Sequence, residues 1–219
     1  MIIKYPQDLL DQVRARTADR PLAGFTPGQG PLHPDLMLVG EAPGRHEEQV
    51  NIPFSGASGQ ELMKLLNSIG YSRDNTYITS VVRQRPYSIK RVRDKKTGAL
   101  VEKRPNRTPT KKEVLAFAPL FDWELATVGP RIIVPLGNTA LQRLLGPSAN
   151  IGDLHGQKLV RPIQQAAPDG RGYQWSPNEY TLMPMYHPAA ILYARRLLPT
   201  VQEDWQKLGR LVAALPKKE

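Results

Sequence analysis

The stretch LMLVGEAPGRHEEQVNIPFSGASG, residues 36–59, joins a short apolar run to two loops of small residues. The apolar run 36–39 predicts a buried strand that ends at Gly40, because Gly and Pro close it directly. The second loop, 53–59, leads into a helix predicted over 60–69. This order indicates an α/β unit. The loops are expected at the carboxyl end of the strand, where open parallel sheets bind their ligands.

The rest of the chain repeats the alternation of strand and helix. A capping box, Thr110-Lys111-Lys112-Glu113, predicts the start of one helix, and a second box beginning at Thr200 predicts the start of the closing helix. A basic hairpin is expected over 88–104, with its turn near residues 96–98. Together with residues 36–40, three more segments read as strands: 76–82, 131–137 and 180–186. We therefore expect a three-layer α/β/α fold with a central, mainly parallel four-stranded sheet, in one domain spanning 1–219.

Composition narrows the class of protein. The chain has 219 residues, 40% of them hydrophobic and 23% charged, as is usual for a soluble globular domain. No apolar run approaches the roughly 18 residues of a membrane span, and the first residues are too polar for a secretory signal. There is no cysteine, which excludes disulfides and thiolate metal sites. We expect a cytoplasmic protein, nucleoid-associated if it is bacterial, with no membrane contact.

The positive charge is concentrated in one segment. Residues 83–112 hold twelve Lys and Arg against two Asp and Glu, and so carry the whole net charge of +10. The remaining 18 basic and 18 acidic residues balance. A polyanion such as nucleic acid fits this concentration, because each neutralised phosphate releases counterions. The alternative is a solvated loop that is basic for solubility alone.

Several motifs together resemble the family 4 uracil-DNA glycosylases, over roughly residues 35–212. GEAPG at 40–44 is followed by Glu47-Glu48. The later segments, in family order, are NIPFSGASGQELM, YITSVVRQRP, NRTPT, PLGNTALQRLLG and MYHPAAILY. The resemblance implies the α/β/α glycosylase fold and hydrolysis of the N-glycosidic bond of uracil, or of a related deaminated base, in DNA.

A base inside a duplex must be flipped out before an enzyme can act on it, so a pocket is required. Phe54, held between a proline and a small-residue loop, is suited to stacking on a pyrimidine. Gly40 and Ala42, with Pro43 beside them, would let the backbone approach the base closely. Ser80 stands where the family has an asparagine that reads the uracil edge. A hydroxyl offers one rotating group where an amide offers a donor and an acceptor, which bears on base selectivity and on activity.

Three residues are candidates for catalysis. His187 would donate a hydrogen bond to the base oxygen as negative charge develops on the departing uracil. Glu41 and Glu47 would supply negative charge for the cation-like sugar, or a base for water. The residues leave the choice between the two glutamates open. We favour Glu47 for water and Glu41 for a structural or electrostatic part.

The expected DNA contacts fall into three groups. Small residues ahead of the 60–69 helix could hold a phosphate at a helix N-terminus: Ser55, Gly56 and Ser58. Basic residues would grip phosphates flanking the flipped nucleotide: Lys90, Arg91, Arg93, Lys95, Lys96 and Arg107. By the resemblance, one loop enters the minor groove: Pro188, Ala189 and Ala190, with Ile191 as the apolar wedge. The partner is thus DNA, double- or single-stranded, carrying a damaged base, and the protein is expected to be a monomer.

Family 4 members typically hold an iron–sulfur cluster with four cysteines, and this chain departs from that pattern. Gln84 and Phe117 stand at two of the cysteine positions, and residues 15–24 replace the amino-terminal pair. We expect no cofactor and no metal, with apolar packing at Phe117 in the structural place of the cluster. Two functions stay open: an active cluster-free glycosylase, or a catalytically weakened relative that binds damaged or single-stranded DNA. A small-nucleotide hydrolase is disfavoured by the concentrated positive charge.

Overall fold

The structure, a computed structural model, describes residues 1–94 and 96–216. Its main sheet has five strands in the order β3-β2-β7-β9-β8. These are β2 (Leu36–Gly40), β3 (Thr76–Ser80), β7 (Ile132–Pro135), β8 (Leu159–Ala166) and β9 (Tyr173–Leu182). The pairs β2–β3, β2–β7 and β7–β9 are parallel, and β8 pairs antiparallel with β9. The expected mainly parallel sheet is confirmed, with β8 as one strand more than the four predicted.

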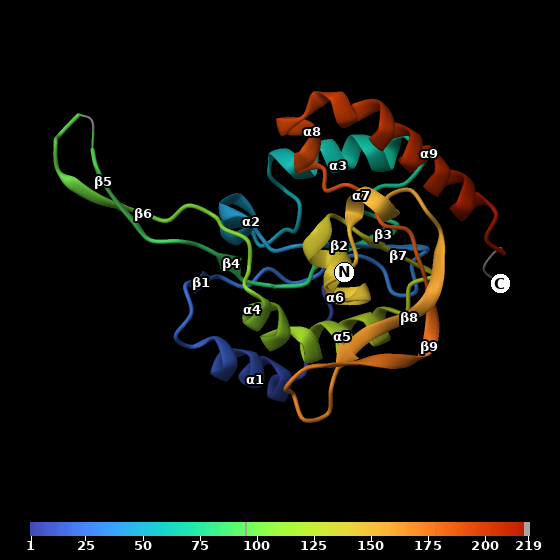
Figure 1. The fold of residues 1–219 in the computed structure, drawn as a ribbon, viewed down its shortest axis with the longest axis horizontal. Helices are drawn as coiled ribbons and strands as arrows, with labels where there is room; N and C mark the ends of the chain where they lie inside the picture. Colours follow the sequence, from blue (N-terminus) through green and yellow to red (C-terminus); the bar gives the residue numbers. More distant parts are fainter. Residues whose placement is uncertain (95, 217–219) are drawn as a thin grey trace.

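Helices cover both faces of this sheet, as Figure 1 shows, with α3, α8 and α9 above it and α1, α4 and α5 below. The upper group is α3 (Ala57–Asn67), α8 (Ala189–Tyr193) and α9 (Leu198–Ala213), with the short η1 (Arg195–Leu197) between the last two. The lower core is formed by α1 (Gln7–Thr17), α4 (Lys111–Ala116), α5 (Ala118–Val128) and α6 (Asn138–Leu145). Two short helices complete the fold, α2 (Arg45–Val50) and α7 (Ile151–Leu154). The three-layer α/β/α architecture is confirmed.

Strand β2 shows why the sheet is central. Met37 and Val39 pack in the core with α1, α4, α5 and α6, whereas Leu36 and Leu38 pack in the core with α3 and α9. All five residues of β2 are buried. A continuous apolar run is what a strand covered on both faces requires. The loop that follows β2 therefore starts from a fixed point in the middle of the molecule.

One predicted helix start is confirmed and the other is wrong. At α4, Oγ1 of Thr110 accepts from the backbone N–H of Glu113 at 3.2 Å, and the Glu113 carboxylate accepts from the Thr110 N–H at 2.7 Å. The capping box is thus complete. The closing helix α9, however, begins at Leu198, two residues before Thr200. Pro199 lies in its first turn, where the missing N–H costs nothing, so the proline marks this helix start.

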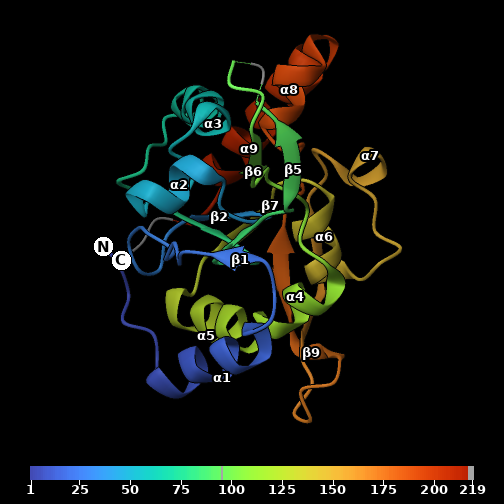
Figure 2. The same cartoon turned by 90° about the vertical axis from the view of Figure 1, so that its left-hand side faces the viewer.

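The basic segment forms an arm. Strands β5 (Lys90–Arg93) and β6 (Leu100–Lys103) pair antiparallel, which confirms the hairpin predicted over 88–104. The arm projects from the left of the body in Figure 1 and therefore points toward the viewer in Figure 2. At its base, β1 (Leu22–Ala23) pairs with β4 (Arg85–Pro86). No helix within residues 1–94 and 96–216 is long and apolar enough to cross a membrane.

Candidate active site

The carboxyl ends of the central strands surround a cavity of about 750 Å³. Gly40, the last residue of β2, is in register with Ser80, the last residue of β3, and Glu41 follows directly. His187 lies two residues beyond Met185, which bridges to Leu136 after β7. Predicted site residues that line the cavity are Glu41, Ala42, Pro43, Glu47, Phe54, Gly56, Ser58, Ser80, Arg107, His187 and Ala189. The fold thus brings together most of the residues that the motifs indicated.

The Phe54 loop is held in an uncommon backbone conformation. Phe54 has φ of +52°, in the left-handed region that non-glycine residues rarely adopt. The guanidinium of Arg73 donates to the Pro53 carbonyl at 2.8 Å and also to the Phe54 carbonyl. A Cβ at Gly59 would lie 1.8 Å from that same Phe54 oxygen, so only glycine fits there. Together these contacts fix the direction in which the aromatic ring points.

Gly40 serves the aromatic ring rather than the ligand. A Cβ on Gly40 would lie 2.6 Å from Cε2 of Phe54, so the missing side chain lets the ring settle against the end of β2. Gly40 is buried beneath this ring and does not line the cavity. The expectation that Gly40 itself touches the base is therefore wrong in this structure. The residue acts on the pocket through Phe54.

His187 lies beside Phe54, with their ring centroids 5.5 Å apart and the planes tilted by 33°. Its Nδ1 accepts from the backbone N–H of Ala189 at 3.2 Å, which assigns the proton of the neutral ring to Nε2. Burial lowers the pKa of His187 to about 4, although the nearby Glu47 carboxylate acts in the opposite direction. At neutral pH the ring is therefore an uncharged hydrogen-bond donor.

Glu47 joins the two loops of the site. One carboxylate oxygen accepts from the Gly44 N–H at 3.1 Å, and the other accepts from the Gly56 N–H at 2.8 Å. The residue is buried on α2. Gly44 belongs to the loop after β2, and Gly56 precedes α3. Both oxygens are thus engaged in holding the pocket together.

Glu41 is less buried than Glu47 and is held at one oxygen only. The Thr139 hydroxyl, from α6, donates to Oε2 of Glu41 at 2.5 Å. Within the described part of the chain, no hydrogen bond to Oε1 is found. This arrangement orients the carboxylate at the cavity wall and leaves one oxygen for a ligand or a water molecule.

Ser80 lines the cavity with its hydroxyl proton already in use. Its Oγ donates to the Val82 carbonyl at 2.9 Å. The hydroxyl therefore presents lone pairs, and it acts toward a ligand as an acceptor. Uracil carries an N–H on its pairing edge, whereas the same ring position of cytosine is an acceptor.

Among the predicted DNA contacts, the wedge is wrong. The Ser55 hydroxyl is buried without a hydrogen-bond partner in the described residues, so only the backbone N–H of Ser55 stays a predicted phosphate contact. Ile191 is 0% exposed and packs in the core that contains residues of α3 and α9, so it cannot serve as the wedge. The next two residues are the exposed ones, Leu192 at 43% and Tyr193 at 89%, and both line the cavity. The sequence motif showed the loop but not which side of α8 faces outward.

The remaining predicted contacts are spread over the loop and the arm. Pro188 and Ala190 lie in or beside α8 without lining the cavity. Arg107 lines it, but its guanidinium donates to both oxygens of Glu113, at 2.8 and 2.7 Å, which raises its pKa. On the arm, Lys90, Arg91, Arg93 and Lys96 are exposed, and Lys95 lies outside the described residues. Among the residues that the sequence did not single out, Arg45, His46 and Asn106 also line the cavity.

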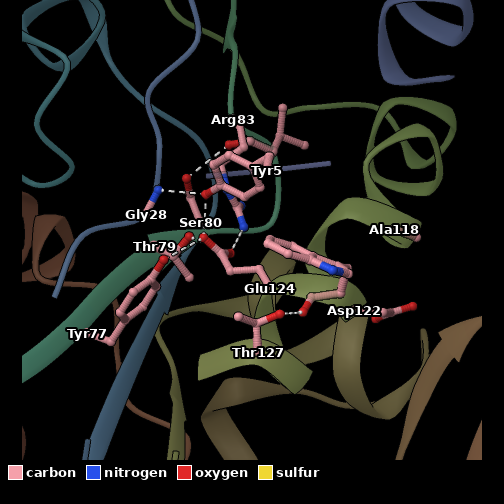
Figure 3. A network of polar contacts seen from close by, with 12 residues as sticks. Tyr5, Gly28, Tyr77, Thr79, Ser80, Arg83, Ala118, Asp122, Glu124 and Thr127 are labelled. Atoms are coloured by element: carbon pink, nitrogen blue, oxygen red, sulfur yellow. Dashed lines mark hydrogen bonds and ion pairs between the residues drawn. The ribbon is translucent and has the colours of Figure 1, made fainter. Parts of the chain in front are cut away.

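Below the end of β3 lies a buried polar network, drawn in Figure 3. Glu124 on α5 accepts from the Tyr5 hydroxyl at 2.5 Å, the Tyr77 hydroxyl at 3.0 Å and the Thr79 hydroxyl at 3.0 Å. It also forms an ion pair with Arg83, and both residues are at most 1% exposed. The network ties the amino-terminal segment, β3 and α5 together beside Ser80.

The residues at the expected cluster positions do not fit an iron–sulfur cluster. Such clusters are held by cysteine thiolates, and the chain has no cysteine. Phe117 is 1% exposed and packs in the lower core, and the Thr17 hydroxyl donates to the Gln84 side chain at 3.4 Å. In residues 1–94 and 96–216, no group of three His, Asp or Glu side chains could hold a metal ion.

A parallel sheet with an aromatic, a histidine and two carboxylates at its carboxyl end is an arrangement that suits chemistry on a flat, polar base. The family model of the uracil DNA glycosylase superfamily matches residues 27–209, and the chain belongs to this superfamily.

Curated relatives are similar over most of the chain. A type-4 uracil-DNA glycosylase of Sulfurisphaera tokodaii is 32% identical over 195 residues, which cover 88% of this chain and 76% of the relative. The type-4 uracil-DNA glycosylase of Archaeoglobus fulgidus is 32% identical over 190 residues, which cover 85% of this chain and 81% of that relative. A type-5 uracil-DNA glycosylase of Mycobacterium tuberculosis is 26% identical over 223 aligned positions, which cover 98% of this chain and 76% of that relative. The resemblance to family 4 is thereby confirmed.

Proposed function

We propose that this protein removes uracil from DNA by hydrolysing its N-glycosidic bond, as the first step of base excision repair. The observation that carries the proposal is the pairing of Phe54 with a neutral His187 in one cavity, on the fold of the uracil DNA glycosylase superfamily. The names of the relatives add support, since all of those described above are uracil-DNA glycosylases.

In this proposal the flipped base enters the cavity and stacks on the Phe54 ring. Ser80 accepts from the ring N–H of uracil, since its own proton is held by the Val82 carbonyl. His187 donates from Nε2 to a carbonyl oxygen of the base. As the bond between C1′ and the base nitrogen breaks, the electron pair stays on the base, and a neutral donor stabilises the resulting anion.

A water molecule completes the reaction by bonding to C1′ and giving up a proton. We assign the acceptor of this proton to Glu41, because one of its oxygens is oriented by Thr139 and the other is not engaged by the described residues. Glu47, whose two oxygens hold the loops, supplies negative charge near the cation-like sugar and positions the pocket. This assignment reverses our preference from the sequence, which gave water to Glu47 and a structural or electrostatic part to Glu41.

The two glutamates can be separated by experiment. We expect Glu41→Gln to lower kcat by about 100-fold or more with KM and the melting temperature nearly unchanged, since a proton acceptor is lost. Glu47→Gln should lower the melting temperature and raise KM as well, because an amide cannot accept from both backbone N–H groups. If Glu47→Gln lost only kcat and Glu41→Gln destabilised the fold, the assignment would be reversed.

The function itself is tested with labelled oligonucleotides that contain uracil, hypoxanthine or only normal bases. We expect abasic sites at uracil, detected by strand cleavage in alkali, and none in the normal-base control. Ser80 in place of the family asparagine favours a second candidate, a DNA-binding relative with weakened catalysis. Tight binding of uracil-containing DNA without any abasic product would establish that candidate instead.

We further propose that the protein needs no iron–sulfur cluster and acts as a monomer in the cytoplasm. The absence of cysteine supports the first point, because such clusters are held by cysteine thiolates. Purified protein should be colourless, and a chelator should leave its melting temperature unchanged. Stoichiometric iron would contradict the first point, and a dimer in light scattering the second.

A further inference from the structure

A second cavity, of about 830 Å³, lies where the arm joins the body. Five of the residues that line it are basic, and Glu102 is the acidic one. The basic residues come from α2, β4, both strands of the arm and the residue after β6: Arg45, Arg85, Lys90, Lys103 and Arg104. We call this cavity the arm groove. Its strong positive charge indicates a ligand with several negative charges.

The wall of the arm groove is built and held in place. The guanidinium groups of Arg85 and Arg104 both lie over the Tyr87 ring, each 5.2 Å from the ring centroid. Nη1 of Arg85 donates to the Arg104 carbonyl at 3.0 Å and to Oδ1 of Asn106 at 3.2 Å. The Arg45 guanidinium donates to the same Arg104 carbonyl at 3.2 Å. These contacts connect the base of the arm to α2.

Part of the positive charge is not neutralised inside the protein. Arg104 pairs with Glu102 at 2.9 Å, and Arg85 pairs with Glu48. For Arg45, Lys90 and Lys103, no ion pair with a carboxylate is found in residues 1–94 and 96–216, and all three residues are exposed. A chain of phosphates is the polyanion best matched to such a row of cations.

The arm groove adjoins the candidate active site. Arg45 and Asn106 line both cavities, so they form the boundary between them. Leu192 and Tyr193, at the α8 rim of the active site, do not line the arm groove. On the α8 side Arg195 and Arg196 of η1 are exposed, but they line neither cavity, so the basic groove that adjoins the pocket lies on the arm side.

We propose that the arm groove binds the phosphodiester backbone on one side of the flipped nucleotide, so that DNA recognition is asymmetric about the target base. The proposal rests on the proposed function for the position of that base in the pocket. It assigns a ligand to the groove and a phosphate-contacting role to Arg45, Lys90 and Lys103. The nucleotides on the other side of the base contribute much less to affinity.

The test uses single-stranded oligonucleotides of equal length with one 2′-fluorinated deoxyuridine near the 5′ end or near the 3′ end. The fluorine disfavours a cation-like sugar and so slows bond cleavage while binding is measured by fluorescence anisotropy. We expect one of the two to bind at least about tenfold more weakly. Its slope of log affinity against log salt should be smaller, by about 0.7 for each phosphate that the protein no longer neutralises.

The variant Lys90→Ala/Lys103→Ala should remove this difference in affinity, because it should bind the better of the two oligonucleotides more weakly. The matched control, Lys158→Ala/Arg161→Ala, loses the same charge on exposed residues that line neither cavity, and should keep the difference. Equal affinity for both oligonucleotides in the unaltered protein would overturn the proposal, as would a difference that survives in Lys90→Ala/Lys103→Ala. Binding of a poly-glutamate peptide that depends on Lys90 and Lys103, without asymmetry on DNA, would assign the groove to an acidic protein instead.

Failure of this proposal is distinguishable from failure of the proposed function. Release of uracil from an ordinary substrate reports the chemistry of the pocket, whatever the flanking affinity. Asymmetric binding reports the arm groove even in a protein that releases no base.

Discussion

Two glycines of the pocket leave space that atoms of Phe54, rather than a ligand, occupy. Gly40 lies under the Phe54 ring, and Gly59 lies against the Phe54 carbonyl. Arg73 holds that carbonyl from the turn after α3, at the cost of partial burial, which lowers its pKa. The left-handed conformation of Phe54 is thus fixed from three sides. The small residues of the motif, which suggested a ligand-binding loop, mainly position the Phe54 ring.

Ser80 offers a prediction about base selection. Ser80→Ala should lower kcat/KM for uracil by about tenfold, because the acceptor for the ring N–H is lost. Ser80→Asn restores a donor and an acceptor, and should raise the ratio of uracil to cytosine excision. Both are measured by abasic-site formation under single-turnover conditions, with Ser72→Ala, outside the cavity, as the control. An unchanged ratio in both Ser80 variants would mean that another group reads the edge.

The lowered pKa of His187 gives a prediction about how stability and activity change at acid pH. Its pKa in the folded protein is about 4, against an ordinary value of 6.5. Above pH 6.5 the ring is neutral in both the folded and unfolded states and does not affect stability. As the pH falls from 6.5 to 4, the unfolded chain binds a proton that the folded protein does not, so stability decreases across this window.

Activity should depend on the same titration. Protonation of Nδ1 removes the acceptor for the Ala189 N–H, so kcat should fall with a midpoint near pH 4. His187→Asn should lose most activity together with this limb, and should lose less stability between pH 6.5 and 4. The measurements are kcat and urea unfolding as functions of pH in both proteins. A midpoint near pH 6.5 in the unaltered protein would contradict the assignment of a neutral ring.

At the scale of elements, the sequence predicted what depends on local patterns. The apolar run 36–39 was sufficient for β2, and the Thr110 box was sufficient for α4. Strand β8 was missed because it is a partly exposed edge strand with Pro162 and an irregular register at its centre. The side of α8 that faces the core depends on how the helix rotates against α3 and α9, which no short motif specifies.

The candidate site was predictable to the same extent. Residues at strand ends, such as Glu41, Ser80 and His187, were found because parallel strands end at one edge of the sheet. The roles of Glu41 and Glu47 were not, because they depend on which backbone N–H groups come within reach after folding. Arg45 and Asn106 were missed because exposed polar residues carry no pattern until two loops meet.

The Glu124 network gives a prediction about stability. Replacement of Glu124 by Ala leaves Arg83 as an unpaired buried charge and should cost about 3–5 kcal/mol in the free energy of unfolding. Glu124→Gln keeps part of the hydrogen bonding and should cost less. Urea denaturation measures both, with the exposed Glu179→Ala as a control that should change stability by no more than about 0.5 kcal/mol. A cost for Glu124→Ala as small as that of the control would show that the network contributes nothing to stability.

For the whole molecule, most of the excess positive charge lies outside the two cores. Residues 83–112 carry the net charge of +10, but Arg83 and Arg85 of this segment are buried in ion pairs with Glu124 and Glu48 and belong to the body. The residues of β5 and β6 are exposed or half-buried and belong to neither core. The arm can therefore change without a change of fold.

This separation predicts the effect of removing charge from the outer part of the arm. Replacing Arg91, Arg93 and Lys96 by Gln should weaken binding to duplexes of all sequences alike, because phosphate contacts carry no base information. The slope of log affinity against log salt should shrink by about 0.9 for each phosphate that the arm no longer neutralises. Turnover at saturating substrate and the melting temperature should stay as they are, since these side chains line neither cavity and pack in neither core. The matched control replaces three cations far from the arm in sequence: Lys158, Arg161 and Arg171. If the arm variant binds with the original affinity and salt slope, the outer arm is a solvated extension, and contact with DNA is confined to the pocket and the arm groove.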